Sequence, residues 1–181
     1  MSPEIVAVTF YVLAAFLGYF FLSGFIWGAG FEPTRRRDID AAAKLLELHE
    51  GMLVYDLGSG TGDVVIQLAK EYKVRCVGIE VDPLKAWISR LRILKAQKLK
   101  NSIEIRRTNF LNANISEADA VYVFLSGGTR IMRSLETKLT TELKSGARVA
   151  SYVHSFPDLK PVSISGDIKV YSPADLKTHA L

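Results

Sequence analysis

The segment 54–63, with the sequence VYDLGSGTGD, joins an apolar run to three glycines placed at every second position. Glycine loses more backbone entropy on folding than any other residue, so such a run needs a structural reason. The usual reason is the close approach of a ligand to the backbone. We therefore predict a buried strand over 52–57, a helix over 63–72, and a ligand-binding loop between them.

The rest of the chain alternates between strand-like and helix-like segments. Apolar runs predict further strands over 74–79, 103–106, 120–125 and 148–153. Two short runs, 162–164 and 168–171, predict a final hairpin. Strands separated by helices build a parallel, doubly wound sheet with its ligand site at the carboxyl ends of the strands. We expect an α/β fold with a mostly parallel, seven-stranded, Rossmann-like sheet.

Turn and capping residues set the expected ends of the helices. Thr34 is a candidate cap for a first helix, which Gly51 should end. Asp82 and Pro83 predict the start of another helix, because proline is favoured at the first helical position. This second helix should run to about Leu99.

The N-terminal segment 5–31 carries no charged residue. A transmembrane helix needs about 20 predominantly apolar residues. We predict a transmembrane anchor over 1–31, with 5–27 in the lipid bilayer, followed by one domain over 32–181. A cleaved signal peptide is less favoured, since it would have a positive start and a shorter apolar core. A buried core helix is also less favoured, because the segment is apolar on all sides.

Three arginines, 35–37, follow this segment. Positive residues tend to stay on the cytoplasmic side, so we expect a single-pass protein with its domain on the cytoplasmic or an equivalent inner side of the membrane. The single cysteine, Cys76, agrees, because no disulfide framework requires an oxidising compartment.

The overall charge excludes little, but it argues against one partner. A net charge of +4 is too small to indicate nucleic acid, and no Cys/His cluster indicates a metal. One predicted helix is strongly basic, with Arg90, Arg92, Lys95, Lys98 and Lys100. These charges form either a solvated helix face or a contact for anionic lipid or an acidic partner.

The glycine spacing narrows the choice of ligand. Gly58, Gly60 and Gly62 do not match the dinucleotide spacing G-x-G-x-x-G, and no lysine follows them as in a P-loop. Carboxylates end two strands, since Asp56 precedes the loop and Glu80 ends the next strand. A carboxylate at the Glu80 position can accept hydrogen bonds from both hydroxyls of a ribose.

With Asn109 after the third strand and LKSGARV at 143–149, these motifs resemble the class I S-adenosylmethionine-dependent methyltransferases. The resemblance implies S-adenosyl-L-methionine as the cofactor, with Glu80 at its ribose, Asp56 near its amino acid end, and Asn109 and Phe110 at its adenine. Asn109 also fits a simple turn, which asparagine favours. The implied cofactor-binding set is Thr34, Asp56, Gly58, Ser59, Gly60, Gly62, Asp63, Glu80, Asn109 and Phe110.

A narrower resemblance covers nearly the whole domain. The segments EPT at 32–34, YDLGSGTGD at 55–63, WISR at 87–90 and VYVFL at 121–125 are similar to those of small protein-lysine methyltransferases. That group includes membrane-anchored mitochondrial enzymes acting on the c subunit of ATP synthase and on the adenine nucleotide translocase. The resemblance implies transfer of methyl groups to lysines of membrane or membrane-associated proteins. The alternatives are methylation of a lipid or quinone-like molecule and a non-catalytic membrane-bound module.

Methyl transfer to lysine requires a neutral amine. A lysine with a pKa of about 10.4 costs roughly 4.6 kcal/mol to deprotonate at pH 7, and an apolar channel lowers that cost by disfavouring the ammonium. The candidates for such a channel are Tyr122, Phe124, Leu125 and Phe156, although Tyr122 and Phe124 fit the sheet core equally well.

No residue stands out as a general base. His154 ends the fifth strand, where a lone histidine is more often structural. After the fourth strand, 125–128 reads LSGG, in place of the Asn/Asp-Pro-Pro-aromatic motif of nucleic-acid amino-methyltransferases. This difference again argues against a nucleic-acid substrate.

Overall fold

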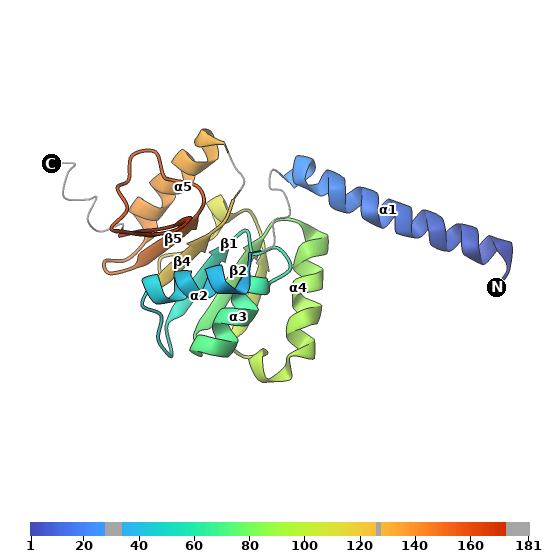
Figure 1. Cartoon of the computed structure of the whole chain (residues 1–181), viewed down its shortest axis with the longest axis horizontal. Coiled ribbons are helices and arrows are strands. Elements are labelled where there is room, and N and C mark those ends of the chain that lie inside the picture. Colours follow the sequence, from blue (N-terminus) through green and yellow to red (C-terminus); the bar gives the residue numbers. More distant parts are fainter. Residues whose placement is uncertain (28–33, 126–127, 173–181) are drawn as a thin grey trace.

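A computed structural model describes residues 1–27, 34–125 and 128–172, apart from the side chains at 20, 21 and 23–27. Its centre is one seven-stranded sheet with the order β3-β2-β1-β4-β5-β7-β6 (Figure 1). The pairs that β1 forms with β2 and β4 are parallel, while β7 runs antiparallel to both of its neighbours. The strands are β1 (Leu53–Leu57), β2 (Arg75–Glu80), β3 (Ile103–Arg107), β4 (Ala120–Val123), β5 (Arg148–Tyr152), β6 (Ser163–Ser165) and β7 (Ile168–Tyr171).

Helices cover both faces of this sheet. The helices α2 (Arg36–Leu45), α3 (Asp63–Tyr72) and α4 (Pro83–Lys95) pack on one face, and α5 (Thr129–Glu142) packs on the other (Figure 1). Two single turns, η1 (Gln97–Leu99) and η2 (Phe110–Asn112), flank β3. The expected doubly wound, mostly parallel sheet is confirmed, as is the final hairpin.

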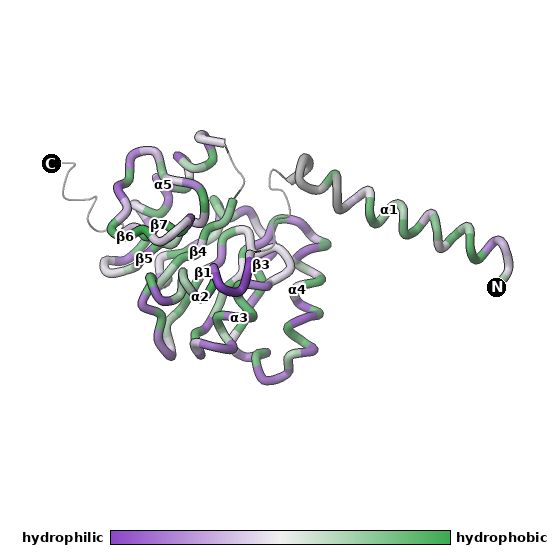
Figure 2. The backbone as a smooth tube through the Cα atoms, viewed as in Figure 1, coloured by the Kyte–Doolittle hydropathy of each residue, from purple (hydrophilic) through white to green (hydrophobic). Residues whose placement is uncertain are grey.

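The two apolar cores follow from the alternation of side chains along each strand. In β1, Val54 faces the core beneath α2 and α3, while Tyr55 and Leu57 face the core beneath α5. Figure 2 shows the apolar character of the central strands. Asp56 shares the parity of Val54, so its carboxyl group points to the α2–α3 side at the end of the central strand.

The first domain helix ends earlier than predicted. Gly51 does not end it, because α2 stops at Leu45 and Glu47 takes up a left-handed conformation with φ 55°. The amide of Glu47 donates to the carbonyl of Lys44, and the amide of Leu48 donates to that of Ala43. This pair of bonds is a Schellman motif, which satisfies the last carbonyls of a helix without glycine.

The cap and the length of two helices also differ from the prediction. Arg35, and not Thr34, occupies the N-cap position of α2, and it makes no side-chain capping bond. α4 ends at Lys95, because Ala96 leaves the helical region before the turn η1. The partly buried Leu99 then packs against the α2–α3 core, which turns the chain back towards β3.

The N-terminal helix α1 (Pro3–Trp27) extends away from the domain (Figure 1). Its described side chains up to Leu17 are exposed. The hydroxyl of Tyr19 links it to the domain by donating to Asp82 Oδ1 over 2.8 Å. Within the described part of the chain, no helix combines the length and the apolarity that crossing a membrane requires. The predicted anchor therefore has no support from these residues, and 28–31 lie outside them.

Candidate active site

The glycine loop follows the end of β1, the strand at which the order reverses towards β4, and it is hydrogen-bonded to the end of β2. The amides of Gly58 and Ser59 both donate to the carbonyl of Ile79, over 2.9 and 3.0 Å. The amide of Gly62 donates back to the carbonyl of Ser59 over 2.9 Å, which closes the turn before α3. Parallel sheets bind ligands at this crevice, so the loop is in the position that the sequence predicts.

Gly60 and Gly62 are required for different reasons, although both have positive φ angles of 54° and 84°. A Cβ atom on Gly62 would lie 2.3 Å from Ser89 Oγ, so this glycine allows α3 and α4 to pack closely. A Cβ atom on Gly60 would meet nothing within 4 Å. The open space beside Gly60 is therefore available to a ligand that approaches the backbone.

Glu80 lies opposite this space and is only 7% exposed. Its Oε2 accepts a hydrogen bond from the amide of Gly60 over 2.7 Å, and its Oε1 accepts one from the amide of Asp82 over 2.8 Å. Each carboxylate oxygen has a second lone pair, which these contacts leave available. The carboxylate can thus accept two further hydrogen bonds, as a pair of ribose hydroxyls requires.

Asp56 is a second buried carboxyl group beside the loop. Burial raises its pKa to about 8, and the negative charges of Glu80 and Asp63 add to this rise. Its Oδ2 is buried and makes no hydrogen bond within the described structure. A buried carboxyl oxygen without a partner is costly, and a bound cation or donor would relieve that cost.

Together these features fit S-adenosylmethionine, the expected cofactor. The ribose offers two donors, and the ammonium of the amino acid end and the sulfonium carry positive charge. Glu80 can accept hydrogen bonds from the ribose hydroxyls, and Asp56, which precedes the same loop, can favour the positive charge. Gly60 leaves room for the ligand beside its backbone. The chemistry of these donors and acceptors therefore matches a cationic nucleoside.

Aromatic residues lie next to Asp56 on the same face of the sheet. Tyr122 of β4 is the direct register partner of Asp56. The rings of Phe124 and Tyr152 meet edge to face, with centroids 4.7 Å apart, and the Tyr152 hydroxyl donates to Asp38 Oδ2 over 3.1 Å. Burial raises the pKa of the Tyr122 and Tyr152 phenols, so both phenols stay protonated at neutral pH.

The four channel candidates do not gather on one side. Tyr122 and Phe124 belong to the α2–α3 face, whereas Leu125 and Phe156 belong to the α5 face. Phe156 packs edge to face on Tyr171, with ring centroids 4.9 Å apart. Of these four, only Tyr122 and Phe124 therefore lie beside Asp56. The alternation of side chains along the strand already predicts that 122 and 124 share one face and that 125 lies on the other. A role for any of the four in a substrate channel stays a prediction.

Thr34 lies close to Tyr122. Its side chain opposes the rise that burial causes in the pKa of the Tyr122 phenol. This contact brings the segment before α2 to the end of β4, beside the Asp56 carboxyl group. Thr34 is thus near the expected site, although not as a helix cap.

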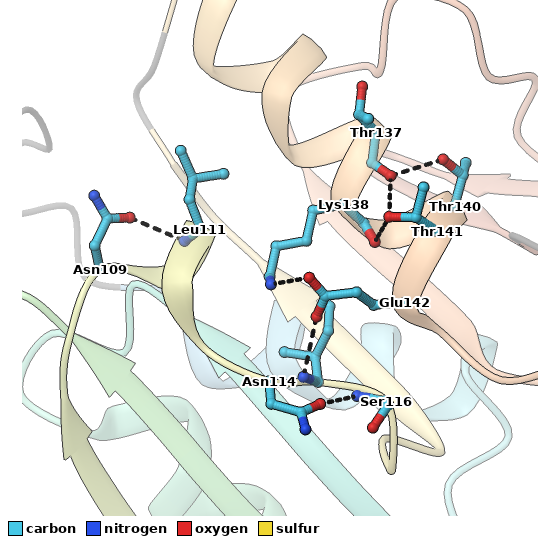
Figure 3. A network of polar contacts seen from close by, with 10 residues as sticks. Asn109, Leu111, Asn114, Ser116, Thr137, Lys138, Thr140, Thr141 and Glu142 are labelled. Atoms are coloured by element: carbon cyan, nitrogen blue, oxygen red, sulfur yellow. Dashed lines mark hydrogen bonds and ion pairs between the residues drawn. The ribbon is translucent and has the colours of Figure 1, made fainter.

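Asn109 and Phe110 follow β3, as the sequence predicts. The Oδ1 of Asn109 accepts a bond from the amide of Leu111 over 2.9 Å and so caps the turn η2 (Figure 3). Phe110 packs against the core beneath α5. The turn role of Asn109 is thus present, and its contact with adenine stays a prediction.

The same loop is fixed to α5. Lys138 Nζ contacts Glu142 Oε1 over 2.5 Å, and Glu142 Oε2 accepts a longer bond of 3.4 Å from the amide of Ile115 (Figure 3). The side chain of Lys138 is only 6% exposed and that of Glu142 is 36% exposed, so this ion pair is partly shielded from water. Glu142 thus ties the segment after η2 to α5.

Arg92 is a contributor to the site that sequence reasoning missed. It projects from α4 to the glycine loop, where Nη1 donates to the carbonyl of Thr61 over 2.8 Å and Nη2 donates to Asp63 Oδ1 over 2.7 Å. The hydrogen bond from Arg92 is the main cause that lowers the pKa of Asp63. Asp63, which the resemblance assigns to the cofactor, is thus already engaged by Arg92 and by the Thr61 hydroxyl.

A strained turn follows β5 near the same end of the sheet. Val153 has φ 67°, which is rare for a β-branched residue, and the amide of His154 donates to the carbonyl of Tyr152 over 2.8 Å. The Val153 side chain is 44% exposed. The turn places Val153 and His154 at the rim of the sheet, and no described contact gives the His154 ring the role of a base.

Comparisons with known proteins agree with this geometry. The sequence profile of the ANTKMT methyltransferase domain matches residues 56–163. A protein-lysine N-methyltransferase from Saccharolobus islandicus (strain REY15A) is 34% identical over 125 residues, which are 66% of this chain and 73% of that protein. A Homo sapiens lysine N-methyltransferase named for the c subunit of ATP synthase is 32% identical over 137 residues, which are 76% of this chain and 57% of that protein.

A solved structure also shows that the fold is that of a methyltransferase. An RNA methyltransferase from Salinibacter ruber, in complex with S-adenosyl-L-homocysteine, superimposes with a TM-score of 0.71 at 30% identity. The match covers 77% of this chain and 91% of that chain. By contrast, the chain spans little more than half the length of the human relative.

The open space beside Gly60 yields a first prediction. Gly60→Ala should weaken S-adenosylmethionine binding at least about tenfold in calorimetry, because the new methyl group enters the space reserved for the ligand. Gly166→Ala is the matched control, since Gly166 has a similar φ of 57° and also meets nothing within 4 Å. Both variants should lose about 1 kcal/mol of stability. Equal cofactor affinity in the two would place the ligand elsewhere.

The buried Asp56 yields a pH dependence. Its pKa is raised from 3.8 to about 8 in the folded chain, so it stabilises the apoprotein most below pH 4 and loses that contribution as the pH rises to 8. Ionisation over the upper part of this range should attract the cationic cofactor. Binding should therefore strengthen from pH 6 to pH 8, by at most about tenfold per pH unit. Asp56→Asn should flatten both profiles, and unchanged slopes would show that Asp56 does not titrate in this window.

Arg92 yields a matched pair on one helix. Arg92→Gln should weaken cofactor binding about threefold to tenfold, a modest change because the ion pair is partly exposed. The pKa of Asp63, followed by NMR, should rise towards its usual value. Arg90→Gln is the control, because Arg90 donates to the carbonyl of Ile105 and does not touch the loop. If both variants bind the cofactor like the wild type, Arg92 does not support the loop.

Proposed function

Because this chain belongs to the ANTKMT methyltransferase domain family, we propose that it methylates lysine side chains of membrane or membrane-associated proteins. Its fold is the class I methyltransferase α/β fold and its cofactor is S-adenosylmethionine. The observation that carries the proposal is the pair of buried carboxyl groups at the glycine loop, Asp56 at the end of β1 and Glu80 at the amide of Gly60. The names of two relatives support lysine as the acceptor.

Alignment is the main task of such an enzyme. When bound, S-adenosylmethionine supplies an activated methyl group on a positively charged sulfur. Glu80 and the Gly60 backbone hold the nucleoside part, Arg92 keeps the loop in place, and Asp56 favours the positive charge near the ends of β1 and β4. Fixing both reactants in line lowers the barrier, because their relative motion is already restricted.

The acceptor amine must be neutral when it reacts. Tyr122, Phe124 and Tyr152 lie on the face of the sheet that carries Asp56, and in this proposal the exclusion of water by these residues favours the neutral amine. The raised pKa values of the two phenols keep their protons in place, so neither phenol takes the proton of the amine. In this proposal the lysine loses its proton to water before it enters.

The membrane location of the substrate is part of this proposal, and the exposed apolar residues of the N-terminal helix are its motivation. Its exposed apolar residues include Ile5, Val8, Phe10, Val12 and Leu17, and the arginines 35–37 follow it. The segment before Tyr19, from 3 to 18, is 16 residues long and rises about 24 Å. A bilayer core of about 30 Å is somewhat thicker. A single-pass anchor would therefore thin the bilayer or release Tyr19 from Asp82.

The test is transfer of radiolabelled methyl groups from S-adenosylmethionine to membrane extract by the full chain. Label should appear in protein, on methylated lysines found by mass spectrometry. Glu80→Gln should abolish it, because a donor NH₂ would replace an acceptor oxygen beside a backbone amide and weaken cofactor binding roughly 10- to 150-fold.

Label that appears elsewhere than in protein, or no label, would contradict the proposal. Label in lipid would favour the small-molecule alternative, label in RNA would follow the Salinibacter ruber enzyme, and no label would indicate a non-catalytic module. The orientation is tested in the same membranes. Protease added on the outer side should leave 34–172 intact, and digestion from that side would reverse the proposed cytoplasmic or inner location.

A further inference from the structure

The outer face of α4 carries an apolar stripe. Trp87, Leu91 and Leu94 are 56%, 36% and 53% exposed, and their spacing places them on one side of the helix. A helix face that packs on nothing would ordinarily be polar. This stripe is therefore a candidate interaction surface.

Cations lie at the end of this stripe. Lys95 ends α4, and Lys98 and Lys100 follow within or next to η1, and all three are exposed. In the described part of the chain, none of the three forms an ion pair. Arg90 and Arg92 differ, because both donate hydrogen bonds to the domain. The free positive charges beside exposed tryptophan and leucine match an anionic, partly apolar surface.

The position of α4 connects this stripe to the N-terminal helix. Tyr19 of α1 donates to Asp82, and Asp82 caps the start of α4 by accepting bonds from the amides of Leu84 and Lys85. α1 leaves the domain from the side that α4 occupies and crosses the direction of α4 (Figure 1). Asp82 therefore links the N-terminal helix to the start of the helix that carries the stripe.

We propose that the α4 face, formed by Trp87, Leu91, Leu94, Lys95 and Lys98, rests on the surface of an anionic lipid bilayer. The inference rests on the membrane location in the proposed function and adds the surface that sets the orientation of the domain. Tryptophan and leucine enter the headgroup region while the lysines bind lipid phosphates. Because α4 also carries Arg92 and starts at Asp82, this contact fixes the cofactor loop close to the bilayer.

The test follows Trp87 directly. The chain has two tryptophans, so Trp27→Phe leaves Trp87 as the only one. The full chain is reconstituted into phosphatidylcholine vesicles with or without phosphatidylglycerol, using lipids brominated near the headgroup or near the chain end. With phosphatidylglycerol, Trp87 emission should shift to shorter wavelength and be quenched by the shallow bromines more than by the deep ones.

Charge reversal separates this contact from insertion of α1. In the Lys95→Glu/Lys98→Glu variant, the ratio of contacting to free Trp87 should fall about fivefold or more for each lysine. Arg130→Glu/Arg133→Glu is the control, because it makes the same charge change on exposed residues of α5, on the opposite face of the sheet. This control variant should keep the full quenching.

Three results would overturn the lipid contact. The first is no quenching of Trp87. The second is quenching that is as strong with neutral lipid, or in the Lys95→Glu/Lys98→Glu variant, as with the unchanged α4 face and phosphatidylglycerol. The third is quenching or a shift that appears only after a membrane protein is added. Cofactor affinity, measured by calorimetry, should be the same in all variants. A failure of the α4 contact would thus leave methyl transfer intact, and a failure of methyl transfer would leave the Trp87 result unchanged.

Discussion

The two hydrogen bonds that Glu80 accepts hold the site together. One comes from the amide of Gly60 in the loop after β1, and the other from the amide of Asp82 at the start of α4. A single carboxylate thereby fixes the distance between the loop that approaches the cofactor and the helix that carries Arg92. Both bonds are charge-assisted and mostly shielded from water, which makes them stronger than ordinary backbone bonds. Arg92 then returns from α4 to the same loop and closes the arrangement.

The same arrangement brings negative charges together. Asp56 is buried near Glu80 and Asp63, and both raise its pKa beyond the effect of burial. The cation in contact with the loop, Arg92, is engaged by Asp63 and by a backbone carbonyl. The ionised form of Asp56 is therefore stabilised mainly by a bound cation. Such a site favours a cationic ligand, in contrast to a phosphate site.

The hydrogen bonds also extend from the cofactor loop to the N-terminal helix. Glu80 accepts from the amide of Asp82, and the Asp82 carboxylate accepts from Tyr19 and from the first amides of α4. One fully buried side chain, Asp82, therefore contacts both α1 and the start of α4. This connection gives a physical reason why a membrane-bound N-terminus and the exposed face of α4 would orient the cofactor site together.

Local sequence patterns were enough to predict the doubly wound sheet, the glycine loop and the carboxylates at the ends of β1 and β2. These features depend on short periods and on residues with restricted roles, such as glycine at positive φ. The patterns could not reveal the contacts of Arg92 with Asp63, 29 positions away, or of Tyr19 with Asp82, 63 positions away. Long, flexible side chains on helices reach partners that only the packing of the elements defines. Tertiary structure likewise separated Phe156 from Tyr122, because the turn after β5 sends the chain to the opposite face of the sheet.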